Sequence, residues 1–225
     1  MGSIKNNLLS VQNRIDAACA KSGRRVEDIT LLAVTKTVSA DRIREIMELG
    51  VTSLGENRVQ ELLSKYDDLP DASWHIIGHL QTNKVKSIIG KVKLIHSVDS
   101  LRLAEEIGKQ SAARGITTDI LLEVNVSGEE SKYGMNLNFV DEMVEQCSGI
   151  NGLFVKGLMT MAPLGAPEIE IRKIFSSLYK KYVDISSKKY DNVSMEYLSM
   201  GMSNDFDIAI EEGANIVRVG RGLFQ

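Results

Sequence analysis

Cysteine, proline and histidine are scarce in this chain of 225 residues, which contains two, three and three of them respectively. Cys19 and Cys147 each lie within an apolar pattern typical of a helix, and no CxxC pair occurs. We therefore interpret both cysteines as small buried hydrophobes rather than as part of a disulfide framework. Three histidines without ligand spacing, and no cysteine cluster, argue against a metal site.

Long apolar runs and an excess of positive charge are also missing. No run of about 18 apolar residues occurs, and no N-terminal segment combines basic residues, an apolar run and a cleavage site. The net charge is −3 and the basic residues are scattered, which is not the pattern of a nucleic-acid-binding protein. At 43% hydrophobic and 25% charged residues, the composition is typical of a globular protein. We expect a cytoplasmic protein without membrane or nucleic-acid partners.

The most informative stretch is residues 31–37, LLAVTKT, in which four apolar residues precede Lys36. A continuous apolar run bounded by polar residues is typical of a strand that is buried on both faces. Lys36 would lie at the C-terminal end of this strand, where parallel barrels carry their chemistry. The alternative is that Lys36 simply ends the strand and points to solvent, because lysines are rarely buried.

Strand and helix patterns alternate along the chain after an N-terminal helix predicted over residues 4–20. Strands are predicted at residues 29–36, 51–54, 74–77, 94–98, 119–126, 153–159, 195–199 and 215–219. Helices are predicted between them at residues 40–49, 58–66, 83–89, 137–147, 168–181 and 203–212, with one more after Asp99 or Ser100. Alternation predicts a parallel sheet, and eight units favour a closed barrel over an open doubly wound sheet. We expect an α/β fold: one domain over residues 1–225, a single (β/α)8 TIM barrel with an extra N-terminal helix.

Polar residues follow several of the predicted strands, and in a barrel these strand ends would share one mouth. In residues 199–203, SMGMS, the glycine lets the backbone approach a ligand, while Ser203 and the start of the next helix can bind an anion. The loops after strands seven and eight are the usual phosphate site of such a barrel, and Gly220 would supply the other half. The alternative is a plain turn in which Ser203 caps the helix.

Arg218 lies within the last predicted strand, on the opposite face from Val217 and Val219. A buried arginine needs an acceptor, and the ring nitrogen of a ligand would serve. His75 and His96 alternate with apolar neighbours, so we interpret them as core residues. Lys84 and Lys86, near the start of a predicted helix, are expected to face solvent.

Six stretches together resemble one known family. They are residues 32–36 (LAVTK), 54–57 (LGEN), 74–84 (WHIIGHLQTNK), 158–161 (LMTM), 198–203 (LSMGMS) and 217–220 (VRVG). Taken in this order across the whole chain, they resemble the YggS/PROSC family of pyridoxal-phosphate-binding proteins. The fold of that family is the barrel of the alanine racemase N-terminal domain.

The resemblance implies that Lys36 forms a Schiff base with pyridoxal 5'-phosphate (PLP). It implies that the phosphate is held, largely through backbone N–H groups, by Ser199, Gly201, Met202, Ser203 and Gly220. Arg218 would face the pyridine nitrogen, and Asn57 and His79 would line the pocket near the ring. Arg221 stands where the family often carries a small hydroxyl residue, although its backbone N–H can still bind phosphate. Lys132 resembles a family lysine that accepts cofactor outside the main pocket.

An arginine at the ring nitrogen donates a hydrogen bond and keeps that nitrogen unprotonated, which weakens the cofactor as an electron sink. A racemase would also need a second acid or base, which alanine racemases take from a partner subunit's extra domain; none is expected after the last strand here. We therefore expect a non-catalytic, monomeric protein that carries or buffers PLP for apo PLP-dependent enzymes and maintains PLP and amino-acid homeostasis. The alternatives are an amino-acid racemase or lyase and a lysine-based aldolase.

Overall fold

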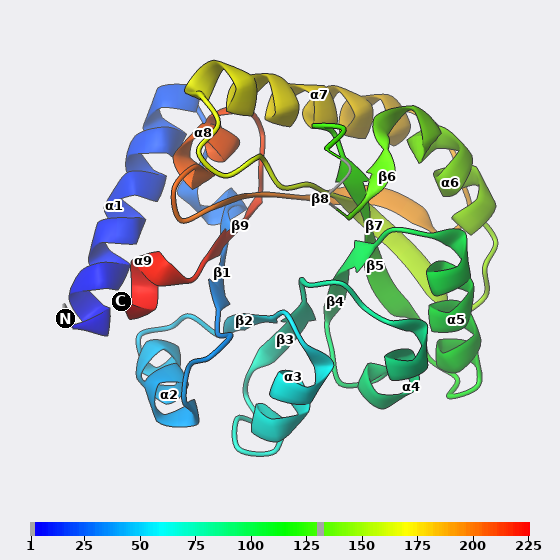
Figure 1. Cartoon of the computed structure of the whole chain (residues 1–225), viewed down its shortest axis with the longest axis horizontal. Helices are drawn as coiled ribbons and strands as arrows, with labels where there is room; N and C mark the ends of the chain where they lie inside the picture. The colour runs from blue at the N-terminus through cyan, green and yellow to red at the C-terminus, as the bar shows by residue number, and fades with distance from the viewer. Residues whose placement is uncertain (1–2, 130–132) are drawn as a thin grey trace.

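The computed structural model describes residues 3–129 and 133–225 and shows a closed barrel of parallel strands surrounded by helices (Figure 1). The strands follow the order β4-β3-β2-β1-β9-β8-β7-β5, and β5 pairs back with β4 to close the barrel. Every pairing is parallel. The predicted (β/α)8 barrel is therefore confirmed.

The barrel strands are β1 (Thr30–Val34), β2 (Ser53–Glu56), β3 (Ser73–Ile76), β4 (Leu94–Val98), β5 (Thr118–Asn125), β7 (Leu153–Met159), β8 (Val193–Met202) and β9 (Ile216–Val219). A two-residue strand, β6 (Met135–Asn136), pairs with β5 outside the barrel. The helices are α1 (Ile4–Ser22), α2 (Ala40–Glu48), α3 (Val59–Tyr66), α4 (Val85–Ile88), α5 (Leu101–Ala112), α6 (Val140–Cys147), α7 (Glu168–Ser186), α8 (Phe206–Glu211) and α9 (Arg221–Phe224). Short 3₁₀ turns occupy Val26–Asp28, Thr82–Lys84 and Leu137–Phe139.

Helix α1 packs against α8 and α9 on the flank of the barrel (Figure 1). The Ser3 side chain accepts a hydrogen bond from the N–H of Asn6 and caps the first turn. Its buried positions recur every three or four residues, which is the spacing of one helical face: Ile4, Leu8, Val11, Ile15 and Ala18. The helix ends where Gly23 adopts a left-handed φ of 69°.

Two layers of apolar side chains fill the molecule. The larger core lies between the strands and the surrounding helices, and includes both buried cysteines, Cys19 and Cys147. A small separate cluster is formed by strand residues Leu32, Leu94, Leu121, Met159 and Ile216. No helix in residues 3–129 or 133–225 has the length and apolar character needed to cross a membrane. Within the same residues, histidine, cysteine and acidic side chains do not gather into a metal-binding group.

The predicted elements differ from the structure mainly around the barrel mouth. Strand β2 runs to Glu56 rather than ending at Leu54, because residues 53–56 pair with β3. Strand β8 continues to Met202, which pairs with Arg218 on β9, so α8 starts at Phe206 and not at residue 203. Helix α9 was not predicted. These shifts alter how the mouth presents its polar residues.

Candidate functional site

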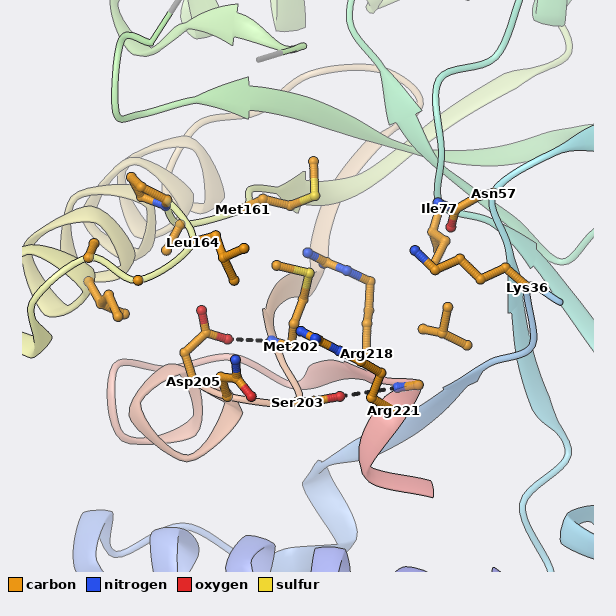
Figure 2. Close-up of a pocket in the computed structure, with 18 residues that line it drawn as sticks. Lys36, Asn57, Ile77, Met161, Leu164, Met202, Ser203, Asp205, Arg218 and Arg221 are labelled. Atoms are coloured by element: carbon orange, nitrogen blue, oxygen red, sulfur yellow. Dashed lines mark hydrogen bonds between the residues drawn. The ribbon is translucent and has the colours of Figure 1, made fainter. Parts of the chain in front are cut away.

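A cavity of about 320 Å³ opens at the C-terminal ends of the strands, where Figure 2 shows its side chains. Its lining comes from the C-terminal parts of β1, β8 and β9, from the loops after β1, β2, β3, β7 and β8, and from α7 and α9. Of the residues singled out in the sequence, it includes Lys36, Asn57, Met202, Ser203, Arg218, Gly220 and Arg221. A volume of this size suits a small ligand.

Lys36 follows β1, and its exposed side chain extends into the cavity beside Ile77 and Asn57 (Figure 2). It also borders a second cavity, which is lined by Arg42 and Arg221 among others. Strand β1 ends at Val34 rather than at Lys36, so Lys36 lies in the turn just beyond the C-terminal end of the first strand, at the barrel mouth where it was expected. Its amine is therefore open to a ligand in the barrel mouth.

Helix α3 holds the backbone on both sides of Lys36. Glu56 is fully buried, and its Oε1 accepts hydrogen bonds from Thr35 Oγ1 and Lys65 Nζ, each at 2.7 Å. Lys65 also donates to the Thr35 carbonyl at 2.9 Å. Burial raises the pKa of Glu56, and the bonds from Lys65 and Thr35 oppose that rise. Beyond Lys36, the N–H of Thr37 donates to Glu61 at 3.2 Å, and Thr37 adopts a left-handed φ of 61°. Such strain persists only where neighbours enforce it.

The loops after β2 and β3 pass close to each other at Asn57 and Gly78. A Cβ at position 78 would lie 2.5 Å from the Asn57 carbonyl oxygen. That distance is too short for a Cβ atom, so this position requires glycine. Asn57 lines the cavity, as the family resemblance implied, whereas His79 does not. The exposed His79 ring instead stacks on Tyr133, with centroids 4.3 Å apart, and its Nδ1 lies 3.3 Å from Asp99 Oδ2.

The turn between β8 and α8 is organised by Asp205, a residue that the sequence analysis missed. Its Oδ1 accepts the Met202 N–H at 2.5 Å, and it occupies the N-cap position of α8. Burial raises its pKa, opposed by the Met202 hydrogen bond. The prediction of a helix beginning at Ser203 is wrong, because β8 runs to Met202 and a turn follows it. In that turn the Asp205 N–H donates to the Met202 carbonyl at 3.0 Å, in addition to the bond from the Met202 N–H to the Asp205 carboxylate. The spacing of an acid three residues after Met202 was the available signal.

Ser203 joins the loops after β8 and β9. Its Oγ accepts hydrogen bonds from the N–H groups of Gly220 and Gly222, both at 3.4 Å. These bonds are long, so both donors are only weakly engaged. Arg221 lies between them on the cavity wall. The loops after β8 and β9 therefore do meet, as the sequence predicted.

Ser199 and Gly201 do not line the cavity. Ser199 is fully buried, and its hydroxyl contacts Arg218 and His96. Gly201 has a φ of 89°, and a Cβ there would lie 2.5 Å from Ala209 Cβ. The close approach that requires glycine at this position is therefore to α8, and an approach of its backbone to a ligand stays a prediction.

Arg218 points into the barrel, as its alternation predicted, and it is buried with 3% of its surface exposed. Its Nη1 donates to Ser199 Oγ at 2.6 Å and its Nη2 to the Thr160 carbonyl at 2.9 Å. Burial lowers its pKa to about 10, so it remains charged at neutral pH. The arginine is fixed at two points while its side chain lines the cavity (Figure 2).

Of the weaker predictions, His75 and His96 are buried as expected. Lys86 is exposed on α4, and Lys84 is half-buried at its start. Lys132 lies outside the described residues.

Glu123 on β5 is a buried acid that the sequence analysis did not single out. It is 3% exposed, and burial together with the Asp99 carboxylate raises its pKa from 4.5 to about 7, opposed by Arg218. The signal was an acid within a predicted apolar strand. Such a carboxyl group would hold a proton close to Arg218 at mildly acidic pH.

We expect Glu123→Gln to stabilise the protein only at higher pH. Because the pKa of Glu123 is higher in the folded than in the unfolded protein, the folded protein binds the proton more tightly. The stability that this gives is fully present below about pH 4.5 and is lost as pH rises through about 7. At roughly 1.36 kcal/mol per pKa unit, the variant should gain up to about 3 kcal/mol at pH 8 and nothing at pH 4.5. Urea unfolding at both pH values measures this, with Glu45→Gln, exposed on α2, as the control. An equal gain in the free energy of unfolding at both pH values would contradict the raised pKa of Glu123.

Comparison with known proteins agrees with this geometry. The family model described as alanine racemase, N-terminal domain, matches residues 4–225. A pyridoxal phosphate homeostasis protein of Aquifex aeolicus is 47% identical over 220 residues, covering 96% of this chain and 95% of the relative. The protein of that name from Escherichia coli is 34% identical over 229 residues, covering 100% of this chain and 97% of the relative. This chain belongs to the pyridoxal phosphate homeostasis protein family.

Solved structures place the family on the same barrel. PipY of Synechococcus elongatus, in a structure without PLP, matches with a TM-score of 0.84 at 33% identity, covering 95% of this chain and 99% of PipY. A second PipY structure has PLP bound and matches with a TM-score of 0.82 at 32% identity, covering 94% and 100%. The family resemblance seen in the sequence is confirmed.

Proposed function

We propose that this protein binds PLP covalently at Lys36 and carries or buffers it for recipient apo enzymes, without turning over amino acids. The observation that carries this proposal is that one cavity is lined both by Lys36, whose amine is accessible, and by Gly220, whose backbone N–H is only weakly engaged. The homologue PipY with PLP bound supports the choice of ligand.

The residues around the cavity fit this cofactor. The weakly engaged N–H of Gly220, the Ser203 hydroxyl and Arg221 would hold a phosphate group. Lys36 would attach to the aldehyde carbon through its amine, with loss of water. Arg218 would face the ring, and Asn57 and Met202 would form walls. Bound PLP supplies an aldehyde and an electron-withdrawing ring.

Ser199 and Gly201 would act indirectly in this site, because neither lines the cavity. Ser199 would support Arg218, and Gly201 would shape the turn that precedes Ser203. His79 would lie at the rim. The backbone N–H of Met202 is already bonded to Asp205, so its contribution would come from its side chain.

The carrier role is favoured over a racemase by the titratable groups at the cavity. Within the described lining these are Lys36, Asp205, Arg218 and Arg221. Tyr133 stacks on His79, and Tyr197 borders a different, small cavity. Racemisation needs a proton donor facing Lys36 across the ring, and a positioned acid or base contributes about 10²–10⁴-fold. The described lining holds no tyrosine, and its one carboxyl group, Asp205, is engaged in the turn by the Met202 N–H.

The test is to mix loaded protein with an apo PLP-dependent enzyme and follow the recovery of its activity. In parallel, loaded protein is incubated with individual L-amino acids while D-isomer, ammonia and carbon dioxide are measured. We expect recovery of activity and turnover far below about 1 s⁻¹, the lower end of ordinary enzymes. Turnover at or above that rate, lost in Lys36→Ala, would favour the racemase or lyase.

We also expect phosphate capture to dominate affinity. Charge-assisted hydrogen bonds are about twice as strong as neutral ones, so pyridoxal without its phosphate should bind at least about 10-fold more weakly than PLP. Arg221→Gln should narrow this difference, whereas Arg44→Gln, an exposed arginine paired with Asp41, should not. Dissociation constants come from fluorescence titration. Equal affinities for pyridoxal and PLP would contradict the proposed phosphate site.

A further inference from the structure

A line of buried polar side chains runs from Arg218 through the barrel interior. Arg218 Nη1 lies 2.6 Å from Ser199 Oγ, Ser199 Oγ lies 2.9 Å from His96 Nδ1, and His96 Nε2 lies 2.9 Å from His75 Nδ1. All four residues are buried. The line joins β9, β8, β4 and β3, four strands of the closed barrel.

The hydrogen atoms along this line have one arrangement that satisfies every link. Arginine has no acceptor, so Arg218 donates to Ser199 Oγ. The Ser199 hydroxyl hydrogen then has His96 Nδ1 as its acceptor. His96 must carry its hydrogen on Nε2 and donate to His75 Nδ1, which leaves the His75 hydrogen on Nε2. The reverse order would give Ser199 two donors and leave its own buried hydrogen without an acceptor, which is costly.

Both imidazoles are neutral at physiological pH. Burial, helped by Lys93, lowers the pKa of His75 to about 3. Burial, with His75 and Arg218 nearby, lowers the pKa of His96 well below its usual value. The charge of the line therefore resides on Arg218 alone, and the histidines act as oriented dipoles.

The far end of the line meets a small cavity. His75 Nε2 is buried and has no hydrogen-bond partner among the described residues. His75 borders a cavity of about 40 Å³ with Lys93, Asp119 and Tyr197. That volume exceeds the roughly 10–15 Å³ that a water molecule needs. A water there would accept the Nε2 hydrogen and complete the line.

We propose that His96 is a positioning residue for the cofactor ring: through Ser199 it holds the Arg218 guanidinium, and the hydrogen-bond line fixes both histidines as Nε2–H tautomers. This role rests on the proposed function, because Arg218 is the group that would meet the ring. The Thr160 carbonyl fixes Nη2 of Arg218, and the Ser199 hydroxyl, held by His96, fixes Nη1 of Arg218. Loss of either contact would let the guanidinium rotate.

The first experiment uses the protein without cofactor. Long-range ¹H–¹⁵N spectra of the imidazole rings distinguish Nε2–H from Nδ1–H tautomers. We expect His75 and His96 both as Nε2–H at neutral pH. An Nδ1–H tautomer, or a charged ring, at His96 would overturn the proposal whether or not the protein binds PLP.

The second experiment measures PLP affinity and the absorption spectrum of the bound cofactor in variants. His96→Leu removes the acceptor for Ser199 and should weaken binding about tenfold, the effect of one hydrogen bond to a charged network, and shift the absorption band. His96→Gln keeps an acceptor and a donor and should restore both. Ser97→Ala, a buried neighbour on β4 whose hydroxyl has no partner among the described residues, is the control and should change neither.

If His96→Leu does not fold, Ser199→Ala breaks the same link with a smaller change and should give the same tenfold loss and spectral shift. Variants that match Ser97→Ala in both readouts would overturn the positioning role. A wild-type protein that takes up no PLP would end the proposed function and the positioning role together, while the tautomer result stands separately.

Discussion

Lys36→Ala is expected to yield a colourless protein that retains its fold. Lys36 is the lysine that lines the cavity within the described residues, so its removal takes away the amine needed for covalent attachment. The side chain is exposed, and substitution of such a residue usually changes stability by less than about 0.5 kcal/mol. Absorption spectra of protein saturated with PLP, together with thermal unfolding, measure both effects.

The matched control is Lys86→Ala, which removes an exposed lysine from α4. This variant should retain the full absorption of the bound cofactor. If Lys36→Ala keeps the same absorption band at the same intensity, then another amine attaches the cofactor and the assignment of Lys36 is wrong.

Gly201→Ala should cause the largest loss of stability among the substitutions considered. A Cβ at this position would lie 2.5 Å from Ala209 Cβ and 2.8 Å from Phe206 Cα, and the φ of 89° is unfavourable for alanine. Both contacts belong to α8, which would have to move away from β8. Overpacking typically costs about 1–3 kcal/mol, and the backbone strain adds about 1 kcal/mol or more. We expect a total loss of about 3 kcal/mol and weaker PLP binding, because Ser203 follows on the same turn.

Gly165→Ala separates the two causes. Gly165 has a φ of 77° and lies on the loop that borders the cavity, but a Cβ there would meet nothing within 4 Å. Its substitution should therefore cost only the backbone strain, about 1 kcal/mol. Urea unfolding of both variants gives the comparison, and equal losses would show that packing against α8 is not what requires glycine at position 201.

Local pattern predicted the placement of the key cationic residues. Lys36 follows a buried strand because its apolar run ends there, and Arg218 points inward because strand side chains alternate. The order of strands and helices was sufficient for the barrel. The placement of these two residues and the order of the elements depend on residues close together in the sequence, so they could be predicted from the sequence alone.

Features that depend on contacts between distant segments were not predictable. Ser199 was expected at the phosphate site, yet it bonds His96, 103 residues away. The pairing of His75 with His96 spans 21 residues and requires the register of β3 and β4. The later start of α8 is different, because Asp205 contacts Met202 only three residues earlier and the sequence holds that signal. The contacts of Ser199 and of the two histidines are tertiary, and local preference does not describe them.

The most direct test of the central claim is borohydride reduction of the PLP-loaded protein, followed by peptide mapping. Reduction makes the lysine attachment permanent, so the labelled peptide identifies the residue. We predict one equivalent of cofactor, found on the peptide that contains Lys36. Label found mainly on another lysine, or no label after saturation with PLP, would contradict the claim.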